Sequence, residues 1–284
     1  KVDRRSLKIG RHFKETLVYF VPTIATSVYT ILDKTMLGWF TGNNKSENGY
    51  YEYATGFVNM SKILIMSFNA VMSARMSFLF GEGRLEEVRR RAERSLDFVL
   101  LMAFPIMMGL AGIAAGFVPW FLGDDYGPVV KLLYVCSPLV LVVGLSDYMG
   151  SQILTPGGKR AVSGKVIVAG AAVNFFLNLL LIPRFHAAGA AGASVAAELF
   201  ITVMYLYLSR SYVKWQMLVK YGWKRAASSL VMCVWVLWLG SVLKTGPITT
   251  FLQIGSGGLL YFAVLFILRD RFLLEQAGRF IRRI

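Results

Sequence analysis

The chain has 284 residues, of which 56% are hydrophobic and 17% are charged. Its mean hydropathy of +0.55 lies above the range of a domain with a wetted surface, so the composition argues against a water-soluble enzyme. The 31 Lys and Arg residues outnumber the 16 Asp and Glu residues and give a net charge of +15. Such a charge is typical both of nucleic-acid-binding proteins and of membrane proteins with basic cytoplasmic loops. The positions of the Lys and Arg residues along the chain distinguish these two classes.

Apolar stretches of about 20 residues, the length that crosses a bilayer core of about 30 Å, recur along the chain. In chain order they cover residues 17–40, 54–80, 96–122, 129–154, 161–182, 190–208, 226–243 and 249–268. A transmembrane barrel would show segments of about ten residues with alternating polarity, whereas these stretches are long and continuously apolar. The sequence therefore predicts an all-α polytopic membrane protein with about eight transmembrane helices.

Lys and Arg are distributed unevenly between two alternating sets of connections. One set, which includes both chain ends, holds 24 of these residues, and the other holds only Lys45, Lys131, Arg184 and Lys244. Cytoplasmic loops retain the positive residues, so the pattern predicts a multi-pass protein of the inner (cytoplasmic) cell membrane with both ends of this chain cytoplasmic. The basic charge is then topological, and no nucleic-acid partner is expected.

Ionisable side chains inside the first two spans are candidate functional residues, because each costs about 2.5–3.5 kcal/mol or more at mid-bilayer. The first span carries Asp33 and Lys34 near its outer end, where a cavity role and an interfacial role are both open. In the second span, Lys62 shares a polar stripe with Asn59 and Asn69. The asparagines could hydrogen-bond to neighbouring helices without any substrate, but the lysine indicates a cavity wall.

Polar residues in the later spans have two interpretations. Asp147 and Glu198 lack a basic neighbour at helical spacing, so each is either a protonated acid bonded to another helix or part of a cation pathway. Asn174 and Asn178 are four residues apart and most simply hold helices together. Arg75 falls near the cytoplasmic end of its span, where an interfacial anchor is the simplest role.

The motifs of soluble catalysis are missing from the sequence. It has no nucleophile elbow, zinc-protease motif, P-loop or dinucleotide fingerprint, and only two histidines. Cys136 and Cys233 lie in apolar runs without a Cys or His partner at ligand spacing. We therefore predict no enzyme, no catalytic residue, no metal site and no cofactor.

Several motifs, each weak alone, occur in an order that resembles a known family. They are TILDKTMLG (30–38), ENGYYE (47–52), QILTPGGK (152–159), NFFLN (174–178) followed by Ile182-Pro183, and the small-residue run from Gly189 to Glu198. The chain resembles bacterial oligosaccharide flippases of the polysaccharide-biosynthesis type, which transport O-antigen or capsule repeat units. These flippases are part of the MATE-like multidrug/oligosaccharidyl-lipid/polysaccharide exporter superfamily.

The resemblance implies two six-helix lobes around a central cavity, with this chain as the C-terminal lobe plus two extra helices. It implies a cytoplasmic basic linker (1–15), a six-helix lobe (16–212), a second cytoplasmic linker (213–225), two additional helices (226–268) and a cytoplasmic tail (269–284). The missing N-terminal lobe would be its partner in the same protein. The chain begins with Lys1 and shows no signal-peptide pattern, so we expect an internal piece of something longer.

The implied function is the flipping of polyprenyl-diphosphate-linked oligosaccharides across the bilayer by alternating access, with cation coupling. Lys62, Lys34 and Arg75 would be the cavity cations that hold the diphosphate, and Asp33, Asp147 or Glu198 would bind a coupling ion. The alternative is a multidrug cation antiporter of the same superfamily, which would need an anionic cavity to bind a cationic drug. A membrane-embedded transferase or ligase is a more distant alternative.

Overall fold

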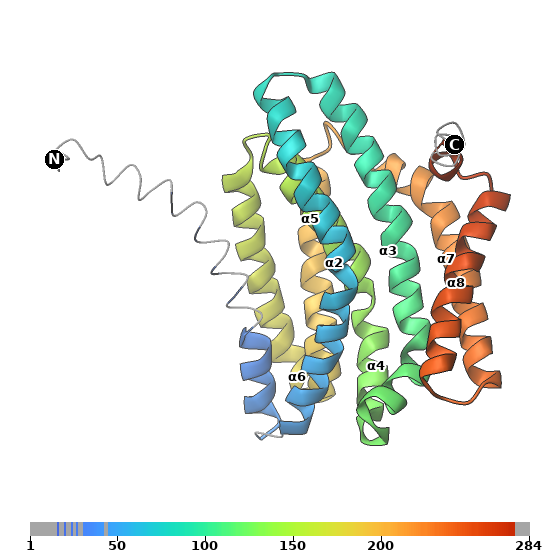
Figure 1. Ribbon diagram of the computed structural model, residues 1–284. Coiled ribbons are helices and arrows are strands. Elements are labelled where there is room, and N and C mark those ends of the chain that lie inside the picture. The colour runs from blue at the N-terminus through green and yellow to red at the C-terminus, as the bar shows by residue number, and fades with distance from the viewer. Residues whose placement is uncertain are drawn as a thin grey trace, which may run out of the picture.

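The computed structural model describes residues 31–42 and 45–275, together with residues 16, 20, 24 and 27. Every regular element in this part of the chain is helical (Figure 1), which confirms the predicted all-α fold. In chain order the elements are a helical segment at residues 31–40, α2 (Lys45–Gly81), α3 (Leu85–Leu122), the 3-10 turn η1 (Asp124–Tyr126), α4 (Gly127–Cys136), α5 (Pro138–Met149), the π-helical turn η2 (Gly150–Leu154), α6 (Arg160–Leu208), α7 (Trp215–Val242) and α8 (Pro247–Ile267). The predicted linker 1–15, most of residues 17–30 in the first predicted span, residues 43–44 and residues 276–284 lie outside the described residues.

The long helices stand side by side and alternate in direction (Figure 1). α2 and α3 pack as an antiparallel pair, and α7 and α8 form a hairpin that packs on α3. The connections after α2, η2, α6 and α8 therefore lie at one end of the bundle, which is the upper end in Figure 1. The connections before α2, after α3 and after α7 lie at the other end.

α6 is folded back on itself. Its 49 residues would extend about 74 Å as one straight helix, far beyond a bilayer core of about 30 Å. His186 breaks the helix with φ 50° and ψ −129°, and the Tyr205 hydroxyl donates a hydrogen bond to the Ser163 carbonyl oxygen at 3.3 Å. A Cβ at Gly189 would collide with the Leu181 backbone, so only glycine lets the halves meet so closely. The two halves run antiparallel and correspond to the predicted spans 161–182 and 190–208.

The lengths and apolar composition of the helices fit a membrane. Five described helices are long and apolar enough to cross it, or six when the pair Asp124–Cys136 and Pro138–Leu154 counts as one span. That pair bends by 42° where Pro138 removes a backbone donor. The multi-pass membrane fold is confirmed, whereas the count of eight stays a prediction because much of the first span is outside the described residues.

Three helices begin about ten residues before their predicted spans. α2 starts at Lys45, whereas the apolar stretch begins near residue 54. α3 starts at Leu85 with a charged, amphipathic turn, whereas the apolar stretch begins near residue 96. α7 starts at Trp215, inside the stretch 213–225 that was expected to be a linker. Apolar length marks the bilayer crossing and does not detect the polar helical turns that continue beyond it.

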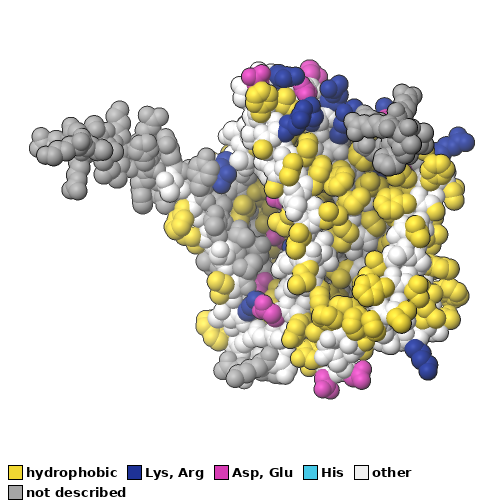
Figure 2. Space-filling model, in the orientation of Figure 1, with side chains coloured by type: hydrophobic (Ala, Val, Ile, Leu, Met, Phe, Trp, Pro, Cys, Tyr) yellow, Lys and Arg dark blue, Asp and Glu magenta, His cyan; other side chains and the backbone are white. Residues whose placement is uncertain are grey.

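The molecule has two apolar cores and an apolar outer surface. One core joins α2 to α6, and a smaller one joins α3 to the α7–α8 hairpin through Leu101, Met232, Val236, Tyr261 and Leu265. Large apolar side chains are also exposed over the middle of the bundle, whereas Lys and Arg side chains gather at its upper end (Figure 2). Such a surface fits lipid around the middle and water at the ends.

Candidate functional site

A buried carboxylate lies where the first described helical segment meets α2 and both halves of α6. Asp33 is only 2% exposed. Its Oδ2 accepts hydrogen bonds from the Tyr51 hydroxyl at 2.9 Å and from the Ser194 hydroxyl at 2.8 Å. Its Oδ1 accepts one from Asn178 Nδ2 at 2.5 Å, and the same amide also donates to Asn174 Oδ1 at 3.1 Å. We call these five residues the Asp33 cluster.

The Asp33 cluster surrounds its carboxylate with neutral donors. Among the described residues, no Lys or Arg forms an ion pair with Asp33, because its neighbour Lys34 pairs with Glu52 instead. Asn178 Oδ1 is buried without a hydrogen-bond partner. Carboxylate, amide and hydroxyl oxygens are ligands of hard cations, so the cluster has the chemistry to hold either a proton on Asp33 or a small alkali cation.

A cavity of about 180 Å³ opens beside this cluster. Its polar lining consists of Asp33, Lys34, Tyr51, Glu52, Thr55, Asn59, Lys62, Ser194 and Glu198. Lys62 is half-buried, and Glu198 and Asp147 lie within electrostatic range of its ammonium group. The cavity therefore combines two lysines with three carboxylates.

A second polar network lies deeper along α2. Asn69 is fully buried, and its amide nitrogen donates to Asp147 Oδ2 at 2.9 Å and to the Gly144 carbonyl at 3.3 Å. Gln152 Nε2 donates to Asn69 Oδ1 at 2.9 Å. One turn further, the Ser73 hydroxyl donates to the Ser151 carbonyl at 2.8 Å. These contacts join α2 to α5 and η2.

The candidate residues from the sequence fall into three groups. Asp33, Asn174 and Asn178 come together in the Asp33 cluster, Asn69 and Asp147 come together in the second network, and Lys34, Lys62, Asn59 and Glu198 line the cavity. Arg75 is exposed and is not among the residues that line this cavity. Within the described residues, no group of three or more His, Cys, Asp or Glu side chains is arranged to hold a metal ion.

Tyr51, Glu52 and Gln152 lie in motifs that carry the family resemblance, but they were not among the candidate site residues predicted from the sequence. Tyr51 lies eight residues before Asn59, on the same face of α2. Extending the polar stripe toward the start of the helix would therefore have identified it. Gln152 follows Asp147 by five residues, which share a face only in a π-helical turn. That turn, η2, has no sequence signature in this chain.

The comparisons with known proteins agree with the membrane fold. Residues 4–131 match the family described as polysaccharide biosynthesis protein. The predicted resemblance is confirmed. A protein of Escherichia coli strain K12 that is named as an O-antigen transporter is 26% identical over 210 residues, which cover 73% of this chain and 48% of that protein. An uncharacterized membrane protein of Methanocaldococcus jannaschii is 24% identical over 189 residues, or 66% of this chain and 37% of that protein.

A solved structure has the same fold. The lipid II flippase MurJ in its inward closed conformation superposes with a TM-score of 0.75 at 18% identity. The match covers 92% of this chain and 56% of that chain. The chain thus spans about half the length, or less, of the proteins it matches, and it resembles the flippases of the polysaccharide-biosynthesis type, as its motifs predict.

Proposed function

We propose that the protein to which this chain belongs flips polyprenyl-diphosphate-linked oligosaccharide repeat units across the cell membrane for surface polysaccharide biosynthesis. The observation that carries this proposal is a lysine-containing cavity inside a membrane bundle whose sequence matches the polysaccharide biosynthesis family. The named relatives, an O-antigen transporter and a lipid II flippase, support it. The protein is a transporter rather than an enzyme.

The substrate dictates what the cavity must supply. The anionic, sugar-bearing head has to cross the apolar core, whereas the lipid tail can remain in the bilayer. A wet cavity with a cation at membrane depth lowers the cost of moving the diphosphate, and Lys62 is a half-buried cation that lines this cavity. Lys34 and Glu52 form an ion pair at the same cavity, so Lys34 becomes available to an anion when that pair opens.

The Asp33 cluster is the site we assign to the coupling ion. Its carboxylate is buried among neutral oxygen and amide groups, so a proton or alkali cation would neutralise a charge that no described side chain balances. Binding there would tie together the segment 31–40, α2 and both halves of α6. Such a link lets an ion gradient bias alternating access.

The topology and the assembly are part of the proposal. The helix directions place the loop 82–84, the turn 155–159 and the connection 209–214 at one end (Figure 1), where cations gather (Figure 2). That end is cytoplasmic, and the missing N-terminal lobe completes the cavity. Cysteine labelling from outside the cell should reach a probe at Asn44 and miss one at Glu87, and the reverse pattern would invert the topology.

The multidrug cation antiporter remains a second candidate because of one observation. The cavity of this lobe carries Asp33, Glu52 and Glu198 beside its two lysines, and a cationic drug would favour those carboxylates. Transport by the full-length protein separates the candidates: accumulation of lipid-linked repeat units on the cytoplasmic side after its deletion supports the flippase. If expression of the full-length protein in the deletion strain restores drug resistance but does not affect repeat-unit export, the antiporter is supported.

Lys62 provides the residue-level test. In the full-length protein, Lys62→Ala should reduce export at least about tenfold at normal membrane levels, since a diphosphate loses a charged partner worth more than about 1.4 kcal/mol. Lys62→Arg should retain part of the activity because charge is the main requirement. Lys131→Ala removes an exposed lysine of α4 that does not line the cavity and serves as the matched control. Normal export by Lys62→Ala would overturn the cavity assignment.

The isolated chain should not transport. Half of the cavity wall belongs to the missing lobe, so the polar stripe of α2 would face lipid or detergent. Reconstituting the chain in liposomes with a labelled lipid-linked sugar measures this directly. Flipping well above that of empty liposomes would contradict the two-lobe assignment.

A further inference from the structure

A second pocket lies at the cation-rich end of the bundle, away from the cavity described above. Its volume is about 480 Å³, and it lies between α3, α7 and the segment that follows α8. No residue of α2, α5 or α6 lines it, so it shares no wall with the cavity around Lys62. Among the described residues, six basic ones line it: Arg90, Arg94, Lys220, Lys224, Arg225 and Arg271.

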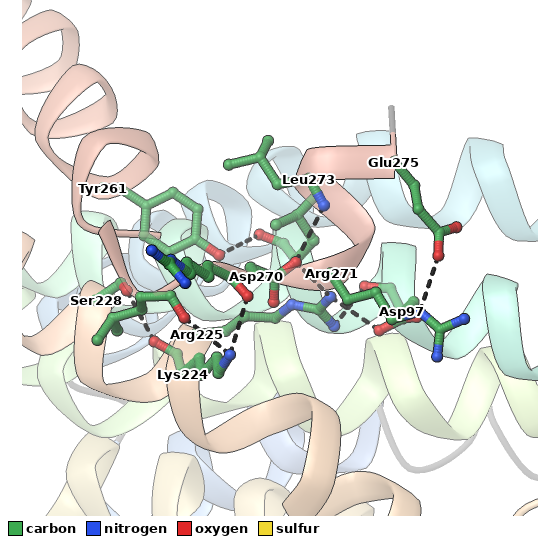
Figure 3. Close-up of polar contacts among 12 residues, drawn as sticks. Asp97, Lys224, Arg225, Ser228, Tyr261, Asp270, Arg271, Leu273 and Glu275 are labelled. Carbon is green, nitrogen blue, oxygen red and sulfur yellow. Dashed lines mark hydrogen bonds and ion pairs between the residues drawn. The ribbon is translucent and has the colours of Figure 1, made fainter. Parts of the chain in front are cut away.

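Three of these basic residues already have partners within the fold (Figure 3). The buried Arg225 pairs with Asp97 at 2.8 Å and with Asp270 at 3.5 Å. Arg271 pairs with Glu275 at 2.8 Å. Lys224 donates to the carbonyl oxygens of Leu268 and Arg269 at 2.8 and 3.0 Å, just beyond the end of α8. These contacts fix the walls of the pocket.

The remaining three basic residues have no carboxylate partner among the described residues. Arg90 and Arg94 are exposed and one helical turn apart on α3, so their guanidinium groups extend from the same face. Lys220 is exposed on the opposite wall, in α7. Of the four acids among the described lining residues, Asp97, Asp270 and Glu275 pair with Arg225 or Arg271, and Glu93 accepts a hydrogen bond from the neutral Tyr221 hydroxyl. Six basic and four acidic side chains leave the described lining with a net charge of +2. Arg225 Nε is also buried without an acceptor. The pocket thus offers unpaired positive charge.

The depth of the pocket matches the headgroup layer. Lys224 bonds to the carbonyls where α8 ends, so the pocket is level with the end of a span. Trp223, which also lines it, is 53% exposed, and tryptophan is enriched at the membrane interface. Basic pockets between transmembrane helices on the cytoplasmic side bind the head groups of acidic lipids. We propose that this pocket binds the phosphate group of an anionic membrane lipid.

The proposal is separate from the flipping function, since the lipid is a resident of the bilayer and not the transported substrate. Its phosphate would lie between Arg90 and Arg94 of α3 and Lys220 of α7, joining the α7–α8 hairpin to the six-helix part of the chain. The pocket would thereby make the packing of the hairpin sensitive to the acidic lipids of the surrounding leaflet.

Native mass spectrometry of the detergent-purified full-length protein tests the site. Phosphatidylglycerol should be retained in preference to phosphatidylcholine. The double variant Arg90→Gln/Arg94→Gln should bind phosphatidylglycerol about 30-fold more weakly, because each basic residue near an acidic lipid contributes about a factor of five. The control Arg210→Gln/Lys214→Gln removes two exposed cations at the same end that do not line the pocket, and it should bind normally.

The outcomes distinguish a lipid site from a diffuse charge effect and from a site for a soluble anion. Equal loss in both double variants would indicate a diffuse charge effect and overturn the proposal. Displacement of the lipid by millimolar inorganic phosphate would overturn it in favour of a soluble anion. If the α3 variant elutes as an aggregate, Lys220→Gln on the opposite wall replaces it, with an expected loss of about fivefold. Unchanged binding by that variant would overturn the proposal.

Discussion

Asp33 and Arg225 are both ionisable and almost completely buried, at 2% and 1% exposure, yet their surroundings differ. Arg225 lies between two carboxylates, Asp97 and Asp270, and also donates to the Asp97 carbonyl at 2.8 Å. Among the described residues, Asp33 is bonded to hydroxyl and amide groups only. The charge of Arg225 is balanced within the fold, whereas the described residues bond to the Asp33 carboxyl group without supplying a positive charge.

This difference separates a structural charge from a functional one. Arg225 connects α7 to α3 and to the segment after α8, so its pairs hold the hairpin against the rest of the bundle. Removing one member of a buried pair leaves an uncompensated charge, which is costly. Asp33 lacks such a partner in the described part of the chain, so an ion or a proton from outside the chain can complete its surroundings. Four tests by substitution can break or sharpen this contrast.

The largest effect is expected for Arg225→Met. It leaves the buried Asp270 and the partly buried Asp97 without their cation, which should lower the free energy of unfolding by about 3–5 kcal/mol. Thermal unfolding and the membrane level of the full-length protein measure this loss. The control Arg271→Gln breaks an exposed ion pair and should cost less than about 1 kcal/mol. Equal stability of the two variants would show that the ion pairs of Arg225 do not stabilise the fold.

A smaller loss of stability is expected for Asn69→Ala. The substitution deletes hydrogen bonds to Asp147, the Gly144 carbonyl and Gln152. Because these partners stay behind in the bundle, the cost should be about 1–3 kcal/mol. Asn59→Ala, at an exposed position of the same stripe, should change stability by less than about 0.5 kcal/mol. Similar values for both would show that the network is not tightly packed.

The fold was largely predictable because apolar length is a local property. The stretches 54–80, 96–122 and 249–268 lie inside α2, α3 and α8 or overlap them almost completely. The break at Pro138 and the π-helical turn divide one predicted span into α4, α5 and η2. Neither the size of that bend nor the π turn follows from apolar length.

The site was only partly predictable because its contacts are long-range. Helical spacing identified Lys62, Asn69 and their stripe, but Asp33 and Ser194 lie 161 residues apart in the sequence and meet through packing alone. Arg225 illustrates the opposite limit. In the sequence it counted as one of many cytoplasmic charges, and only the fold shows that it is buried between two acids. Charge counts give topology and do not reveal which charges are paired.

A third and milder effect is expected for Asp33→Asn. The amide keeps the shape of the carboxylate, and the Tyr51 and Ser194 hydroxyls can rotate to accept its hydrogen bonds. The free energy of unfolding should therefore change by only about 1 kcal/mol. The sharper readout is linkage: if Asp33 holds the coupling cation, added sodium should raise the melting temperature of the parent protein and not that of the variant. A variant that sodium still stabilises would place the cation elsewhere.

The smallest effect is expected at the ion pair between Lys34 and Glu52, which lines the same cavity as Asp33. The two side chains are 43% and 63% exposed, so water screens their attraction, and a double-mutant cycle with Lys34→Ala and Glu52→Ala should give a coupling energy of about 0.2–1 kcal/mol. A pair this weak can open when a diphosphate approaches, whereas a pair coupled by several kcal/mol would keep Lys34 from the substrate. The cycle therefore also tests the function: Glu52→Ala should leave export intact or raise it, because it releases Lys34 for the anion. A Glu52→Ala variant that accumulates normally but no longer exports would show instead that the carboxylate itself contacts the cargo, and this result would favour a cationic substrate.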